Sequence, residues 1–251
     1  MLAVSRKILA YDGKFPSVSD IASDSEFRLM LFFISVLPAF LFLRHWVGAL
    51  EFNDQNDLSA AVQALWGSVF TVLSFLTTTG FESRFWDTAQ NWSGLHSPGI
   101  ILIGLVVMGG GVATTAGGVK LLRVYALYKH GTCELQKLTF PTSIGGAGKT
   151  ARHIRREGAY IAWLFFMLFA ISTAVVMLGL ALTGLTFEQS LGFAVSALST
   201  TGPLAGAVLG ESGNYGLLEN PARAILCAAM VLGRLETLAI IALLNPEFWR
   251  P

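Results

Sequence analysis

The sequence is short of charged residues and of cysteine. Of its 251 residues only 13% are charged, against roughly 25% in soluble domains, and 53% are hydrophobic, with a mean hydropathy of +0.60. A chain this apolar needs lipid, or an unusually large core, to cover its surface. The net charge of +1 gives no field that attracts nucleic acid. Cys133 lies in a basic loop and Cys227 in an apolar run, which argues against a disulfide between them.

Sequence motifs of enzymes are missing as well. The chain has no nucleophile elbow, zinc-protease helix or phosphate loop, and its four histidines share no metal-ligand spacing. The first twenty residues contain no long apolar core followed by small residues, so we expect no signal peptide. These absences predict a protein that is not an enzyme and has no cofactor of its own.

Four segments have the length of a transmembrane helix, which needs roughly 20 mostly apolar residues. Two other apolar runs, residues 58–76 and 187–198, are shorter and reach only part-way across a bilayer. We therefore expect an all-α polytopic membrane protein with two re-entrant or buried half-helices. The four full spans are residues 27–50, 98–123, 159–183 and 222–244.

Each short run ends in hydroxyl side chains and a glycine. The two segments are Thr77-Thr78-Thr79-Gly80-Phe81 and Ser199-Thr200-Thr201-Gly202-Pro203. Backbone carbonyls held by a half-helix replace the hydration shell of a cation, and such hard oxygen ligands suit alkali cations. We predict that the two segments form an ion filter whose glycines direct the carbonyls inward. The predicted cation ligands are the backbone oxygens of Thr78, Thr79, Thr200 and Thr201. The alternative is that these hydroxyls only satisfy backbone groups in a helix bundle.

The order of span, half-span, hydroxyl-glycine segment and span occurs twice. Gly80 and Gly202 lie 122 positions apart, and serine, leucine and threonine residues recur at the same offset. This spacing indicates an internal repeat with parallel topology, because each unit crosses the membrane twice. The loop between the second and third spans is strongly basic and should be cytoplasmic, whereas acidic residues flank the half-spans, which should face outside.

The motifs resemble the Trk/Ktr/HKT superfamily of cation transporters, and most closely its bacterial TrkH-type branch of potassium uptake membrane subunits. The resemblance rests on the TTTGF segment and on the ending GRLETLAIIALLNPEFWRP. It implies four M1–P-loop–M2 repeats around a pseudo-fourfold pore, of which this chain holds the third and fourth. We expect a C-terminal half. A two-repeat protein that dimerises is the alternative. Glycine in every filter segment implies a preference for K⁺, the transported ion.

A glycine-rich stretch interrupts the second span. It resembles the family's intramembrane gating loop, with Ala113-Thr114 where Gly-Ser is common; close helix packing is the alternative. Lys120 at its inner edge fits either the loop or a side chain that extends to the membrane interface. The resemblance also assigns Arg234 to a pore-side barrier, with a structural ion pair as the alternative. The expected loop residues are Gly109, Gly110, Gly111, Ala113, Thr114, Thr115, Gly117, Gly118 and Lys120.

Four regions follow from this interpretation. They are a cytoplasmic segment (1–26), the third-type repeat with a broken second helix (27–122), a basic cytoplasmic loop (123–157) and the fourth-type repeat (158–251). The family implies a homodimer and a cytosolic nucleotide-binding regulatory subunit, in the bacterial cytoplasmic membrane with both termini inside. Two other functions stay open: a secondary transporter that binds its substrate at the membrane midplane, and a non-conducting membrane subunit.

Overall fold

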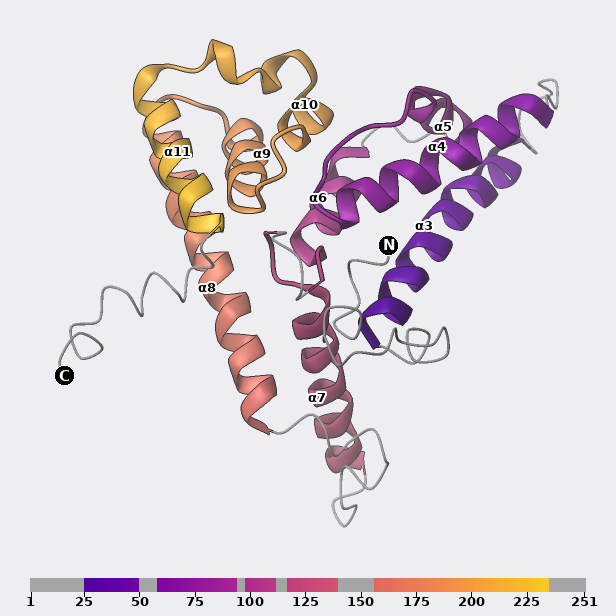
Figure 1. Ribbon diagram of the computed structural model, residues 1–251, viewed down its shortest axis with the longest axis horizontal. Helices are drawn as coiled ribbons and strands as arrows, with labels where there is room; N and C mark the ends of the chain where they lie inside the picture. Colours follow the sequence, from indigo (N-terminus) through magenta and orange to yellow (C-terminus); the bar gives the residue numbers. More distant parts are fainter. Residues whose placement is uncertain (1–24, 50–57, 94–97, 112–116, 140–155, 235–251) are drawn as a thin grey trace, which may run out of the picture.

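The computed structural model describes residues 25–49, 58–93, 98–111, 117–139 and 156–234. The regular structure in these ranges is helical. Figure 1 shows two groups of helices, α3 to α6 and α8 to α11, with α7 running away from the first group.

The first group is built around a half-helix. Helices α3 (Ser25–Ala49) and α6 (Pro98–Met108) both contact α4 (Leu58–Leu76), and the short α5 (Trp86–Ser93) packs on α3 and α4. Phe75 near the end of α4 is completely buried, as is Leu102 of α6. The apolar core of this group therefore surrounds the last turns of α4 and fixes the place where that helix ends.

The second group is built around α9 (Phe187–Leu198), which packs against α8 (Arg156–Ala181) and α11 (Asn220–Arg234). Helix α9 begins with a capping box, in which Thr186 and Gln189 each accept a hydrogen bond from the other's backbone N–H. After α9 the chain forms α10 (Leu204–Leu209) and two 3₁₀ turns, η3 (Gly210–Gly213) and η4 (Tyr215–Leu217), before it enters α11.

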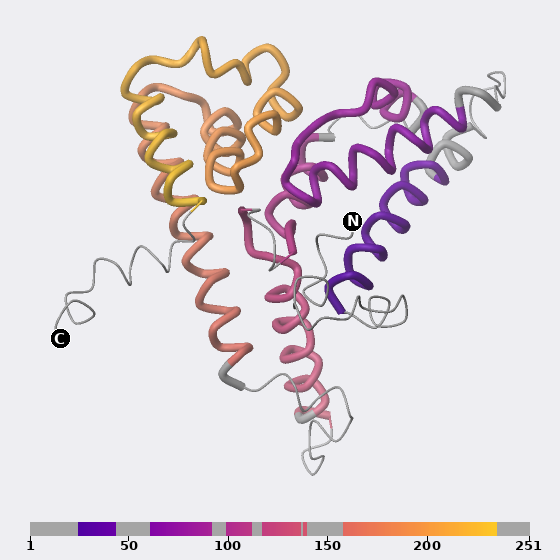
Figure 2. The backbone as a smooth tube through the Cα atoms, in the orientation of Figure 1, coloured from indigo at the N-terminus to yellow at the C-terminus, as the bar shows by residue number. Residues whose placement is uncertain are grey.

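The two halves of the described chain contact each other through their helices. Helix α10 packs against α6, and α7 (Leu121–Thr139) packs against α8. The backbone path leaves α6 at Met108 and becomes helical again at Leu121, so the expected second span is not one helix (Figure 2). This break confirms that the glycine-rich stretch interrupts the helix.

The observed helices confirm both half-spans, which end at Leu76 and Leu198 as the sequence predicts. One part of the prediction is wrong: α7 extends to Thr139, so the basic connector expected at 123–157 begins as a helix. Lysine, leucine, glutamate and glutamine all favour helix, and the charges of lysine and glutamate do not prevent helix formation. The fourth expected span, 222–244, is helical as α11 up to Arg234, and its residues 235–244 lie outside the described residues.

Two helices of the described chain are long and apolar enough to cross a membrane, at Ser25–Leu43 and Gly158–Ala181. The second has only 11% of its most apolar stretch buried inside the protein. Large apolar side chains such as Phe40 of α3 and Val175 of α8 are exposed. An apolar helix with an apolar outer surface is the pattern of a lipid-facing helix rather than of a soluble core.

Candidate functional site

Helix α4 ends in a closed pattern of backbone hydrogen bonds. The N–H of Thr79 donates to the carbonyl of Ser74 at 2.9 Å, and the N–H of Thr78 donates to Phe75 at 3.0 Å. Thr78 has φ of +55°, in the left-handed region. These two bonds and this conformation define a Schellman C-cap, which usually has glycine at the left-handed position. A threonine there carries a steric cost of about 1–2 kcal/mol, so the surrounding packing must hold it in place.

Helix α9 ends in the same way. The N–H of Thr201 donates to Ser196 at 3.0 Å, the N–H of Thr200 donates to Ala197 at 3.1 Å, and Thr200 has φ of +57°. Thr78 and Thr200 are 122 positions apart, which is the offset of the two sequence segments. Two strained caps with one geometry at this offset are a sign of constraint by function rather than of chance.

The caps leave several carbonyls available to a ligand. Among the described residues, no hydrogen-bond donor reaches the backbone oxygens of Thr77, Thr79 or Thr200. The C-terminal end of a helix also carries a partial negative charge. Free carbonyls at two negative helix ends form a site with the chemistry of a cation ligand set.

Thr201 differs from this expectation. Its carbonyl accepts hydrogen bonds from the hydroxyl of Ser196 at 2.8 Å and from the N–H of Leu204 at 3.0 Å. Both lone pairs are therefore used by the protein, because α10 begins directly after the segment and turns this carbonyl toward its first N–H groups. The prediction that the Thr201 oxygen binds a cation does not fit this conformation.

The two glycines also differ. Gly80 has φ of +82°, and a Cβ there would lie 2.7 Å from the Thr201 methyl and 3.1 Å from Pro203. Gly202 is not in the left-handed region, and a Cβ there would meet nothing within 4 Å. The expectation that both glycines provide special backbone angles therefore fits Gly80 but not Gly202, since only Gly80 needs the conformational freedom of glycine.

The two filter segments touch each other. The buried Thr201 hydroxyl lies 3.4 Å from the carbonyl oxygen of Thr78, to which it donates a weak hydrogen bond that it shares with the Ser199 oxygen, also at 3.4 Å. Within the first segment the hydroxyls of Thr77 and Thr79 are 3.0 Å apart and hydrogen-bonded. These contacts bring the predicted residues of both segments to one place in the structure.

An open cavity of about 440 Å³ lies beside the segments. Its walls include Phe81 and Glu82 from the first group, and Pro203, Asn214 and Tyr215 from the second. Burial raises the pKa of the Glu82 carboxyl, and the negative charge of Asp87 raises it further. The carboxylate of Glu82 is therefore placed where it acts on any cation that approaches Gly80.

The glycine-rich stretch packs directly beneath the ends of the half-helices. The N–H of Gly110 donates to the carbonyl of Leu76 at 2.8 Å, and a Cβ on Gly109 would lie 2.6 Å from that oxygen. On the other side, Gly117 lies against the backbone of Ser199. Gly111 is buried, and Gly118 has φ of +82°. The described parts of the expected gating loop thus contact both segments, while Ala113, Thr114 and Thr115 lie outside the described residues.

Lys120 ends this stretch in the left-handed region, with φ of +63°, and only 8% of it is exposed. A side chain that extends outward to a membrane interface would be exposed, so that alternative is wrong for this conformation.

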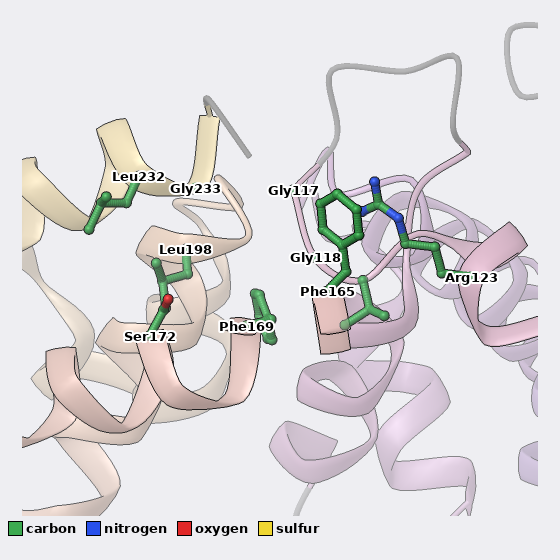
Figure 3. Close-up of a pocket in the computed structure, with 10 residues that line it drawn as sticks. Gly117, Gly118, Arg123, Phe165, Phe169, Ser172, Leu198, Leu232 and Gly233 are labelled. Carbon is green, nitrogen blue, oxygen red and sulfur yellow. The ribbon is translucent and has the colours of Figure 1, made fainter. Parts of the chain in front are cut away.

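A small cavity of about 30 Å³ lies next to the loop, between Gly117 and Gly118 on one side and Phe169 and Leu232 on the other (Figure 3). Arg123 covers its edge, with the guanidinium carbon 3.4 Å from the centre of the Phe165 ring. This cation–π contact joins the start of α7 to α8.

Arg234 does not line this cavity, although it follows Gly233, which does. Gly233 packs against the carbonyl of Leu198, so α11 passes beneath the end of α9. The Arg234 side chain is exposed at the end of the described part of α11. The structure thus brings Gly233, the residue before Arg234, to the cavity beside Gly117 and Gly118.

Comparison with known proteins decides the family. The family model of TrkH, described as a cation transport protein, matches residues 27–249. The chain belongs to the TrkH family. It is 30% identical over 227 residues to the Trk system potassium uptake protein TrkH of Escherichia coli (strain K12), a match that covers 90% of this chain and 44% of that protein. It is 31% identical over 188 residues to the potassium uptake protein TrkG of the same strain, covering 73% and 36%.

The crystal structure of the potassium transporter TrkH from Vibrio parahaemolyticus has the same fold. The TM-score is 0.72 at 26% identity, and the match covers 97% of this chain and 48% of that one. The chain therefore spans less than half the length of the TrkH proteins that it matches. The family consists of transporters, which agrees with the absence of enzyme motifs.

Three residues beside the predicted filter segments and loop were not singled out from the sequence. Arg123 fell within the basic loop, Glu82 among the acidic residues that flank the half-spans, and Tyr215 had no assigned role. Tyr215 donates a hydrogen bond of 3.0 Å to the Gly202 carbonyl. The only signal for it was a single tyrosine in a loop of small and polar residues, and such a signal does not specify a contact.

Proposed function

We propose that this chain forms part of a potassium uptake pathway across the bacterial cytoplasmic membrane. K⁺ passes the ends of α4 and α9 through a filter of backbone carbonyls, and the glycine-rich loop below them gates the route. The matched C-caps at Thr78 and Thr200 are the observation that carries this proposal, because they place free carbonyls at two negative helix ends.

The chain supplies two of four filter segments in this proposal. Helices α3, α4 and α6 with α7 form one M1–P-loop–M2 unit, and α8, α9 and α11 form the next. We assign them to the third and fourth repeats of a pseudo-fourfold pore from the resemblance of the sequence motifs, and the match to just under half of each TrkH relative fits a chain with two of four repeats. The cation ligands we assign are the backbone oxygens of Thr77, Thr79 and Thr200, with Thr78 partly engaged by Thr201.

The gate consists of the loop that contacts both segments. Gly110 is hydrogen-bonded to Leu76, and Gly117 packs on Ser199, so movement of the loop changes the floor of the filter. Arg234 supplies a positive charge near that floor. In a narrow and poorly hydrated passage such a charge is weakly screened and opposes a cation.

The filter segments face outside and the basic residues of α7 and its continuation face the cytoplasm, by the positive-inside rule. A homodimer of the membrane subunit and a cytosolic nucleotide-binding regulator are the proposed partners, since relatives are named as parts of a Trk system. A membrane subunit that does not conduct by itself is the second candidate function, because the chain carries two hydroxyl-glycine segments and the proposed pore needs four.

Flux measurement tests the proposal. Protein expressed from the full genomic locus is reconstituted in vesicles, and uptake of ⁸⁶Rb⁺ is measured with K⁺ or Na⁺ as competitor. The proposal predicts that K⁺ competes and that equal Na⁺ does not. Uptake that saturates tightly and requires a second ion in fixed ratio favours the midplane-binding secondary transporter, and absence of uptake favours the non-conducting subunit.

A further inference from the structure

A hydrogen-bonded pair of hydroxyls lies behind the second filter segment. Ser196 is in α9 and is completely buried, and its Oγ is 2.7 Å from the phenolic oxygen of Tyr215. Tyr215 belongs to η4, which returns toward the segment after α10, and its ring packs edge-on against Phe193 at a centroid distance of 5.1 Å. The ring contact holds the phenol in place.

Both hydroxyls reach the filter backbone. The Ser196 Oγ is 2.8 Å from the carbonyl oxygen of Thr201 and 3.2 Å from that of Gly202, and the Tyr215 hydroxyl is 3.0 Å from the Gly202 oxygen. Each hydroxyl has one proton to donate, so two arrangements are possible. In the first, Tyr215 donates to Ser196 and Ser196 donates to the Thr201 carbonyl. In the second, Ser196 donates to the Thr201 carbonyl and Tyr215 donates to the Gly202 carbonyl. The second arrangement holds two successive carbonyls by side chains outside the segment, whereas the first holds the Thr201 carbonyl alone.

Among the side chains that the structure describes, the first filter segment has no such pair. Ser74 occupies the position that corresponds to Ser196 at the 122-residue offset, and its Oγ is buried without a hydrogen-bond partner in the described structure. The position that corresponds to Tyr215 is Ser93, at the end of α5. The chain after Gly80 is held at a more distant point instead, where the N–H of Ser83 donates to the Thr71 hydroxyl at 3.3 Å.

We propose that Ser196 and Tyr215 are positioning residues that determine ion selectivity, because they hold the Thr201 and Gly202 carbonyls away from the ion path and so keep the Thr200 oxygen directed into it. This inference rests on the proposed filter. Small displacements of a ligand oxygen decide between ions of different radius, whereas the total rate of passage depends on the width of the route and on the gate. Burial raises the pKa of the Tyr215 phenol, which keeps it a donor at neutral pH.

The test uses Tyr215→Phe in protein expressed from the full genomic locus and reconstituted in vesicles. This change removes one oxygen and keeps the contact with Phe193. The reversal potential under a K⁺/Na⁺ gradient gives the permeability ratio. We expect the K⁺ preference to fall about three- to tenfold, the range that corresponds to loss of one buried hydrogen bond, while protein yield and K⁺ flux change less. Ser196→Ala should have the same effect and serves as the second variant.

Two controls separate positioning from general disturbance. Ser190→Ala removes a buried hydroxyl of α9 that has no partner in the described structure, and Ser74→Ala removes the corresponding hydroxyl of the other half-helix. Both should keep the K⁺/Na⁺ ratio. An unchanged ratio in Tyr215→Phe and Ser196→Ala, beside a K⁺-selective wild type, would overturn this inference alone. A wild type without K⁺ preference would overturn the proposed function and this inference with it.

Discussion

The hydroxyl of Thr201 donates a weak 3.4 Å hydrogen bond, shared with the Ser199 oxygen, to the carbonyl oxygen of Thr78, although Thr201 and Thr78 are 123 positions apart in the chain. Each residue lies at the C-terminal end of a half-helix, and Thr201 is completely buried. This contact joins the two filter segments directly, so a change at one segment acts on a carbonyl of the other.

Removal of this hydroxyl should loosen the filter. Thr201→Val keeps the shape of the side chain and removes the donor, so we expect a two- to threefold lower K⁺/Na⁺ permeability ratio and a loss of less than about 1 kcal/mol in stability, because the bond is long. Thr183→Val is the control, since the Thr183 hydroxyl bonds only to Leu180 within its own helix end. Equal ratios in wild type and Thr201→Val would show that the contact has no role in selectivity.

The two filter glycines should respond unequally to alanine. At Gly80 the left-handed φ and the nearby Thr201 methyl predict a cost of about 2 kcal/mol or more and a clear loss of K⁺ preference. At Gly202 neither obstacle exists, and the change should stay within about 0.5 kcal/mol. Thermal unfolding and the permeability ratio of the two variants are the measurements. A larger effect at Gly202 would show that the filter adopts another conformation when it conducts.

Glu82 should make potassium uptake sensitive to external pH. Its raised pKa means that it takes up a proton at a higher pH than an ordinary glutamate, so acidification removes the negative charge beside Gly80. We expect the apparent K⁺ affinity to fall about two- to fivefold as the external pH decreases through this pKa, and the effect to shrink at high salt. Glu82→Gln should have low affinity throughout and lose this pH dependence.

Glu82→Gln should lower the K⁺ affinity but raise the stability of the folded protein. The folded-state pKa of Glu82 is above its unfolded value, so the charged form is disfavoured in the folded protein at neutral pH and the penalty is relieved as the pH falls. Glu82→Gln should therefore unfold at a higher temperature than wild type at neutral pH, and by a smaller margin at low pH. A variant with full K⁺ affinity at every pH would remove Glu82 from the site.

Arg234→Ala should raise the basal K⁺ flux. Loss of a positive charge beneath the filter removes a repulsion of at least about 1 kcal/mol at close range, which corresponds to roughly fivefold or more in rate. Arg234→Lys should raise it less, because the charge is kept while the planar donor group is lost. Arg223→Ala is the control on the same helix, since Arg223 bonds to the Gly216 carbonyl near the other end of α11. Unchanged or abolished flux in folded Arg234→Ala would identify the arginine as part of a structural ion pair.

Local sequence patterns predicted the half-helices to the residue, because apolar runs stop where hydroxyl side chains and glycine begin. The same patterns predicted the break after Met108 from its glycines. They failed at α7, where basic residues suggested a loop although most of them favour helix. Local patterns also could not predict that Gly80 and Gly202 differ in conformation. The difference arises because a helix, α10, directly follows the second segment and not the first, and its first N–H groups bind the carbonyls of that segment. Tyr215 reaches Ser196 through irregular turns, and no periodicity specifies such a contact.

The most direct test of the filter is the position of a bound ion. Crystals or vitrified particles of the protein from the full genomic locus are prepared in Rb⁺ or Tl⁺, and the anomalous signal or density of the ion is located. The account predicts an ion within coordination distance of the carbonyls of Thr79 and Thr200, with Thr201 still bonded to Ser196 and Leu204. An ion found only between the broken helices near the membrane midplane, with none beside Thr79 and Thr200, would contradict it.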